Sequence, residues 1–220
     1  YYMSTNIQDF SGDVQIRGTT FIKANSNTNN LAIGTAAGTT VQGIQTVAIG
    51  NAAGNSIQGI RGIAVGGYSA EDSQGEYAVA VGWTTGRYNQ QGSAVAVGQQ
   101  AGNTSQGNAA VAVGREAGQY SQGNATVAVG RLAGNTSQGV NATAVGFQAG
   151  QSYQGANAVA VGYLAGRTSQ QNNAIAVGYQ AGETSQGINA VAVGYQAGQC
   201  YQEEGSVAVG YQAGFTSQAD

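Results

Sequence analysis

Short apolar runs recur along the chain, and each of them ends at a glycine, as in AVAVG. The residue two before that glycine is Ala in every run, and the residue directly before it is Ile or Val. Three before it stands Leu, Ile or Val, except at Thr143. A β-branched run of this length, bounded by glycine, predicts a short strand because a helix needs a longer periodic segment.

The closing glycines follow one another at intervals of sixteen residues, without an insertion or a deletion. An extra residue in one coil would shift every stacked side chain in the next, so this spacing predicts a solenoid. We divide the chain into a non-repeating N-terminal lead-in or cap (residues 1–30) and twelve 16-residue repeats (residues 31–220). The glycines are Gly34, Gly50, Gly66, Gly82, Gly98, Gly114, Gly130, Gly146, Gly162, Gly178, Gly194 and Gly210.

The residue pattern within each repeat predicts two short strands and two turns. The turn after the apolar strand ends in glycine at eleven of twelve positions, Ala70 being the exception, which indicates a positive φ or a close backbone approach. A polar segment such as TSQ then predicts a second strand. Coils stacked about 4.8 Å apart place equivalent residues in rows along the axis. In the lead-in, residues 13–24 alternate like a strand that pairs with the first coil as a cap.

A glutamine stands eight residues after each closing glycine. Stacked identical amides can hydrogen-bond along an axis, as in the Asn and Gln ladders of cross-β structures, so we assign this row a structural role. Its members are Gln42, Gln58, Gln74, Gln90, Gln106, Gln122, Gln138, Gln154, Gln170, Gln186, Gln202 and Gln218.

The alternation in the apolar strand places Val and Ile on one face and Ala on the other. We expect two Val or Ile side chains per coil to fill the interior and the small Ala face to lie outside. Burial of two such side chains is too little to offset the ordering of a whole coil. This imbalance favours a homo-oligomer with chains side by side, with a monomer that exposes Ala as the alternative.

The strings SVAVG, AVAVG and AIAVG, each followed by a small-residue turn and a polar strand, resemble the head repeats of YadA-type trimeric autotransporter adhesins. The resemblance covers residues 31–220 and implies a left-handed parallel β-roll (β-solenoid) of three chains that binds host surfaces. The family's usual unit is shorter than the sixteen residues found here. In its longer form, with the QAGxTSQG phrasing, the repeat looks more like those of fibre or tail-type proteins of large DNA viruses and phages.

The composition excludes several classes of catalytic site. The chain has no histidine, so Ser–His and Cys–His catalytic arrangements are excluded, and Cys200 is the only cysteine. Two acid doublets occur, Glu71–Asp72 and Glu203–Glu204. Within each, adjacent side chains on a strand would point to opposite faces, so neither doublet is a natural acid–base pair. We expect no enzyme activity, no cofactor and no metal site.

A net charge of −3 without a basic run makes nucleic acid a poor partner, and no apolar run is long enough to span a bilayer. Because the sequence begins at Tyr1 and stops within a repeat, we expect it to belong to a longer polypeptide.

Two aromatic features remain. The first is a ladder one residue after the closing glycine, which either stiffens the turn edge or displays rings to a partner: Phe147, Tyr163, Tyr179, Tyr195 and Tyr211. The second lies within residues 66–92, where aromatic and charged residues replace the usual small ones. We treat it as a candidate contact surface for a glycan or a protein, with drift in a tolerant turn as the alternative: Tyr68, Tyr77, Trp83, Arg87 and Tyr88.

Together these features predict a non-enzymatic segment of an extracellular surface fibre. It is either a virion fibre or the head or shaft of a cell-surface adhesin, and it projects a contact surface for host or cell attachment. A purely structural spacer or filament is one alternative. Another is an ice-binding solenoid built on a Thr-rich row six residues after each glycine, although Asp72, Tyr88 and Tyr120 interrupt that row.

Overall fold

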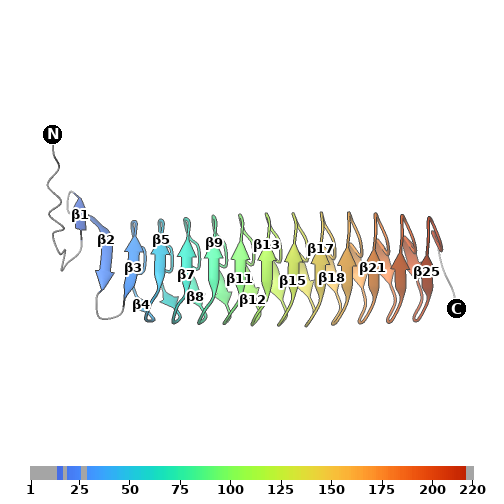
Figure 1. Cartoon of the computed structure of the whole chain (residues 1–220), viewed down its shortest axis with the longest axis horizontal. Coiled ribbons are helices and arrows are strands. Elements are labelled where there is room, and N and C mark those ends of the chain that lie inside the picture. Colours follow the sequence, from blue (N-terminus) through green and yellow to red (C-terminus); the bar gives the residue numbers. More distant parts are fainter. Residues whose placement is uncertain (1–13, 17–18, 26–28, 217–220) are drawn as a thin grey trace.

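The computed structural model describes residues 14–16, 19–25 and 29–216. Over these residues the protein is an all-β solenoid whose coils, sixteen residues each, stack in chain order into a rod (Figure 1). The predicted strand-and-turn repeat is therefore confirmed. Much of the predicted lead-in lies outside the described residues, and so does Gln218 at the end of the predicted glutamine row.

The apolar strands form the first sheet. Within the repeats they pair in parallel and in step, so that Ala96 lies beside Ala112 and Val97 beside Val113. In spatial order its strands are β1 (Val14–Ile16), β2 (Thr19–Asn25), β3 (Asn30–Ile33), β5 (Val47–Ile49), β7 (Ile63–Val65), β9 (Val79–Val81), β11 (Val95–Val97), β13 (Val111–Val113), β15 (Val127–Val129), β17 (Thr143–Val145), β19 (Val159–Val161), β21 (Ile175–Val177), β23 (Val191–Val193) and β25 (Val207–Val209).

The polar segments form the second sheet, which is also parallel and in register, with Gln90 beside Gln106. In chain order its strands are β4 (Val41–Gln42), β6 (Ile57–Gln58), β8 (Asp72–Gln74), β10 (Tyr88–Gln90), β12 (Thr104–Gln106), β14 (Tyr120–Gln122), β16 (Thr136–Gln138), β18 (Ser152–Gln154), β20 (Thr168–Gln170), β22 (Thr184–Gln186) and β24 (Cys200–Gln202).

The strands before the repeats run differently from those within them. β1 pairs antiparallel with β2, and β2 pairs antiparallel with β3 of the first coil. The stretch expected as one strand, residues 13–24, thus contains two described strands, and β2 is the one that lies against the first coil. Pairing of this kind occupies the edge that β3 would otherwise leave open.

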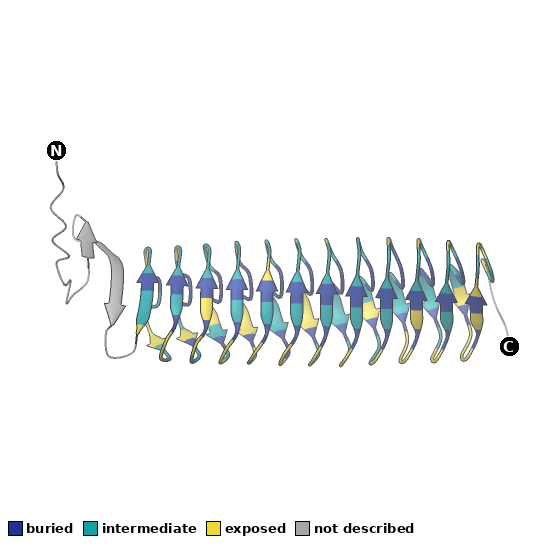
Figure 2. Cartoon of the chain, viewed as in Figure 1, coloured by how far each residue is buried: buried dark blue, intermediate teal, exposed yellow. Residues whose placement is uncertain are grey.

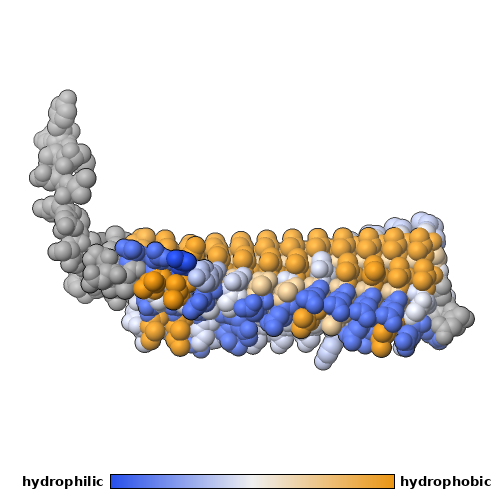
Figure 3. Space-filling view, turned by 60° about the horizontal axis from the view of Figure 1, so that its bottom comes forward, coloured by the Kyte–Doolittle hydropathy of each residue, from blue (hydrophilic) through white to orange (hydrophobic). Residues whose placement is uncertain are grey.

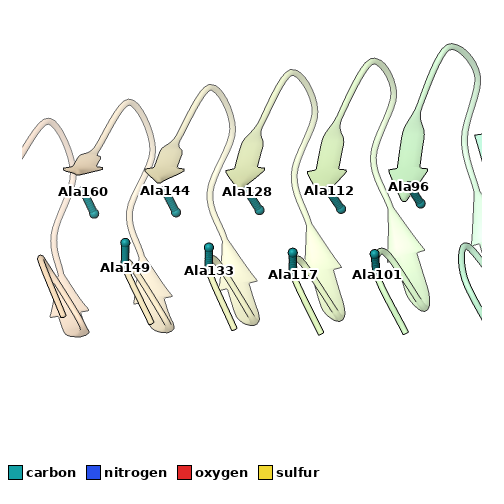
Figure 4. Close-up of a cluster of buried hydrophobic side chains, with 9 residues drawn as sticks. All are labelled: Ala96, Ala101, Ala112, Ala117, Ala128, Ala133, Ala144, Ala149 and Ala160. Carbon is teal, nitrogen blue, oxygen red and sulfur yellow. The ribbon is translucent and has the colours of Figure 1, made fainter. Parts of the chain in front are cut away.

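Alanine, rather than valine, fills the interior of the coils. In β13 the middle residue Ala112 is fully buried, while Val111 and Val113 on either side of it are only partly buried. Ala117, in the turn that follows, points toward Ala112 from the opposite wall (Figure 4). The same arrangement repeats along the rod, so buried residues recur at the same place in successive coils (Figure 2).

The prediction that two Val or Ile per coil fill the interior, with Ala outside, was therefore wrong. The two walls of a sixteen-residue coil approach closely enough for methyl groups to meet, and a larger side chain between them would overpack the interior. The β-branched residues lie on the outer face of the first sheet instead. Glutamines of the second sheet fill the remaining interior space and are among the largest fully buried side chains.

The repeated glycines show the two features that the sequence predicts for them, a close backbone approach and a positive φ. The closing glycine approaches the next coil closely: a Cβ on Gly114 would lie 2.7 Å from the carbonyl oxygen of Gly130. The glycine that ends the following turn has a left-handed backbone, with φ of 52° at Gly150, for example. Ala70, the exception in sequence, adopts the same conformation with φ of 45°.

Candidate contact surface and side-chain rows

The glutamine row lies inside the rod. Gln138 is representative: its Nε2 donates to the carbonyl oxygens of Val127 (2.9 Å) and Ala142 (3.2 Å). The same amide donates to Gln154 Oε1 of the next coil at 3.1 Å, and its own Oε1 accepts from Gln122 Nε2 at 3.1 Å. The Gln138 amide therefore links backbone groups of its own coil as well as the neighbouring coils.

The row is continuous only in stretches. Amide-to-amide hydrogen bonds join Gln74 to Gln106 through Gln90, and they join Gln122 to Gln186 through Gln138, Gln154 and Gln170. Between the two runs, Gln122 Oε1 is buried and accepts no hydrogen bond from the described residues. The remaining described members donate to backbone carbonyls of neighbouring segments: Gln42, Gln58 and Gln202.

The aromatic ladder lies on the outer turn that follows the first sheet. Successive ring centroids from Phe147 to Tyr211 are 5.0–5.3 Å apart, and neighbouring planes differ by 5–11°. The guanidinium of Arg131 continues the ladder, 5.5 Å from the centre of the Phe147 ring. The four tyrosines of the ladder are exposed, so its geometry suits either predicted role, stiffening of this edge or display of rings to a partner.

Four of the five residues of the candidate contact surface lie together, and we call them the aromatic–arginine cluster: Tyr68, Trp83, Arg87 and Tyr88. Trp83 packs edge-on against Tyr68 with centroids 5.3 Å apart. The Arg87 guanidinium lies 5.4 Å from the Tyr68 ring and 4.7 Å from the Tyr88 ring, and it also forms an ion pair with Glu71. The cluster thus holds exposed rings in place around a fixed positive charge.

Trp83 is the most exposed ring of this cluster, with 54% of its surface accessible. Its indole extends over Gly67 of the preceding coil, where a Cβ would lie 2.6 Å from the ring. Gly67 therefore gives the indole room to lie flat on the rod.

Tyr77 belongs to a different part of the surface. It lies in the turn after β8, whereas Tyr68 and Trp83 lie in turns after first-sheet strands. There its ring lies 5.5 Å from the guanidinium of Arg61, whose Nη1 donates to the Tyr77 hydroxyl at 3.4 Å. Tyr77 therefore lies apart from the other four predicted contact residues.

Sequence reasoning missed Arg61 as the partner of Tyr77. Glu71 lies within the irregular stretch of residues 66–92 that the sequence does identify, but its pairing with Arg87 was not predicted. The signal that identifies both is the period itself, since Arg61 precedes Tyr77 by sixteen residues and Glu71 precedes Arg87 by sixteen. In a solenoid, residues one period apart lie side by side along the axis.

Other candidate chemistry is sparse. Among the described residues, no group of three or more His, Cys, Asp or Glu side chains is placed to hold a metal ion, and no helix is long and apolar enough to cross a membrane. Cys200 is a half-buried free thiol in β24. The Thr-rich row lies on the second sheet, where the partly exposed rings of Tyr88 and Tyr120 interrupt it.

The fold and its surface define the molecule as a β-solenoid with stacked side-chain rows. No protein-family model matches the chain, and searches of curated proteins and of solved structures find no match either.

Proposed function

We propose that the chain is a non-enzymatic segment of an extracellular fibre, either a virion fibre or the head or shaft of a cell-surface adhesin. In this proposal three parallel copies lie side by side, each a left-handed coil, as the YadA-like resemblance implies. The rod supplies length and stiffness, and exposed turns supply contacts with a host or cell surface. Repetition of weak contacts along a stiff rod strengthens attachment through avidity.

The observation that carries this proposal is the outer face of the first sheet. Val and Ile residues flanking the buried alanines form apolar rows along the rod (Figure 3). Ile63, Val97 and Ile175 are each 36% exposed. Twelve coils about 4.8 Å apart, each with a strand about 10 Å long, give this face an area of about 600 Å² per chain. This area approaches the surface that each partner buries in a stable interface.

A second copy of this chain is the partner that fits such a face best. Its valine rows have the same spacing by construction, so side chains interdigitate along the whole length, whereas a partner with another period loses register after a few coils. Association through this face would also supply the apolar burial that a narrow, alanine-filled coil lacks.

Light scattering tests the assembly, and we expect about three times the 22.0 kDa mass of the chain. Val129→Glu on the outer face should reduce the mass to that of one chain, because it places charges between the rods. Tyr120→Glu on the second sheet is the matched control and should leave the mass unchanged. A wild-type monomer, or a V129E variant that stays assembled, would refute this interface.

Attachment is tested at the aromatic–arginine cluster. We expect a glycan array to show binding that Trp83→Ala and Tyr88→Ala remove, while Tyr77→Ala on the other turn leaves it intact. Absence of binding, or equal loss in all three variants, would favour the purely structural spacer. Thermal hysteresis of the purified protein would favour the ice-binding alternative instead.

A further inference from the structure

Two hollows lie along the second sheet and the turn that follows it, and we call them the long groove and the short groove. Glutamines of the interior row, among them Gln138 and Gln186, also border them. The long groove has a volume of about 440 Å³ and the short groove about 260 Å³. In the long groove, serines at the middle of second-sheet strands alternate with glycines two residues further on, whereas in the short groove Gln171 follows Ser169 and Gly187 follows Ser185. The serines are Ser105, Ser121 and Ser137 in the long groove and Ser169 and Ser185 in the short groove.

Both grooves lie beside substitutions in the repeat. A glutamine replaces the glycine in the coil before the first serine of the long groove (Gln91) and in the same coil as the first serine of the short groove (Gln171). In the coil after the last serine of each, a tyrosine replaces the serine, and these two rings, Tyr153 and Tyr201, are 68% and 69% exposed. Tyr201 lines the short groove, whereas Tyr153 lies beyond the residues that line the long one.

The groove floors are glycine for a structural reason, since a Cβ on Gly139 would lie 2.6 Å from the backbone nitrogen of Ala156. The serines have no such constraint. Their side chains are exposed or half-exposed, and within the described part of the chain the hydroxyls of Ser105, Ser121 and Ser137 make no hydrogen bond. Each coil therefore offers one free hydroxyl group, repeated about every 4.8 Å along the groove.

From this arrangement we infer that the grooves bind a linear, neutral glycan that lies along the rod. Hydroxyl and amide groups of the lining suit a ligand rich in hydroxyls, and no lining residue described for either groove is charged. The exposed tyrosine at the C-terminal end gives a sugar ring an aromatic surface to stack against. In an extended β-linked chain, one sugar unit advances by about the height of one coil, so successive units meet successive serines.

An extended peptide is the competing ligand, and the lining favours the glycan over it. A peptide bound in a groove is usually recognised through pockets for alternate side chains or through an unpaired sheet edge. The long-groove serines are central residues of strands that already pair on both sides, and three successive coils of its floor carry glycine, at Gly107, Gly123 and Gly139. The inference does not depend on the fibre assembly or on the aromatic–arginine cluster, because the apolar rows lie on the first sheet.

The test uses the purified protein with cellohexaose and chitohexaose as probes, measured by titration calorimetry. We expect two sites per chain. Ser121→Tyr should remove the long-groove site, because the ring replaces a small lining side chain. The variant should still fold, because Tyr already occupies this strand position, with positive φ, at Tyr153 and Tyr201. Ser185→Tyr should likewise remove the short-groove site, and Tyr153→Ser should weaken binding about fivefold through loss of the stacking surface.

Ser73→Tyr is the matched control, since it makes the same substitution at the same strand position in β8, outside both grooves. It should leave both sites and the circular dichroism spectrum unchanged. The inference is overturned if neither hexasaccharide binds, or if S73Y and S121Y bind alike. It is also overturned if a neutral extended peptide displaces the sugars and binds more tightly than they do.

Discussion

Replacing Gln138 with Leu tests whether the buried amides hold the rod together. The side chain is 3% exposed; its two Nε2 hydrogens are shared among three acceptors, and its Oε1 accepts one hydrogen bond. At about 1 kcal/mol net for each of these two donors and one acceptor, the amide contributes about 3 kcal/mol to the free energy of unfolding. Apolar burial of Leu recovers part of this, so we expect a net loss of about 2 kcal/mol.

Gln122, at the same position in the preceding coil, provides the matched comparison. Its Nε2 makes only two hydrogen bonds, to Val111 O at 3.4 Å and to Gln138 Oε1 at 3.1 Å, and its Oε1 has no partner among the described residues. Gln122→Leu should therefore cost about 1 kcal/mol, or about 1 kcal/mol less than Gln138→Leu.

Guanidinium denaturation followed by far-ultraviolet circular dichroism gives the comparison, with both variants and the wild type at one protein concentration because assembly affects stability. Equal destabilisation by the two variants would refute the reasoning, since it would show that volume rather than hydrogen bonding matters at this position. A Q138L variant as stable as the wild type would refute it as well.

Further substitutions test other parts of the fold by the same denaturation assay. Ala144→Val should overpack the interior and lower the free energy of unfolding by about 2 kcal/mol, whereas Ala156→Val at a half-exposed turn should change it by less than about 0.5 kcal/mol; similar effects would contradict an alanine-filled interior. Ala70→Gly should raise the free energy of unfolding by about 0.5–1 kcal/mol, because it relieves an alanine with left-handed backbone. Gly150→Ala should lower it by at least about 1 kcal/mol, and the opposite signs would contradict the role given to positive φ. Tyr179→Ala, which removes two ring contacts, should cost about 1–2 kcal/mol and reduce the near-ultraviolet circular dichroism of the ladder, and an unchanged spectrum would contradict stacking.

Much of the architecture could be predicted from the period. Residues one repeat apart lie beside each other, so the interval that links Tyr163 to Tyr179 and Gln138 to Gln154 predicts both the stacked rings and the amide row. The same rule, applied to Arg61 and Tyr77, would have identified their contact as well.

The candidate contact surface could be predicted only in part. Tyr68, Trp83, Arg87 and Tyr88 were grouped because they interrupt the repeat within a short stretch of sequence, and they do lie together. Tyr77 belongs to the same stretch but lies on the other turn, because half a coil of chain carries it to the opposite end of the strands. Proximity in sequence is a poor guide within one coil, whereas position within the repeat is a good one.

By itself, the sequence determined the sixteen-residue coil, the two strands and two turns of each repeat, and the residues that share a row. These properties follow from spacing, which is local and repeats without interruption. Only the tertiary structure decided which face of the apolar strand points inward, because the pattern Val–Ala–Val alternates equally well in either sense. The distance between the two walls selects alanine for the interior and leaves valine outside, and the grooves exist only where neighbouring coils stack side by side.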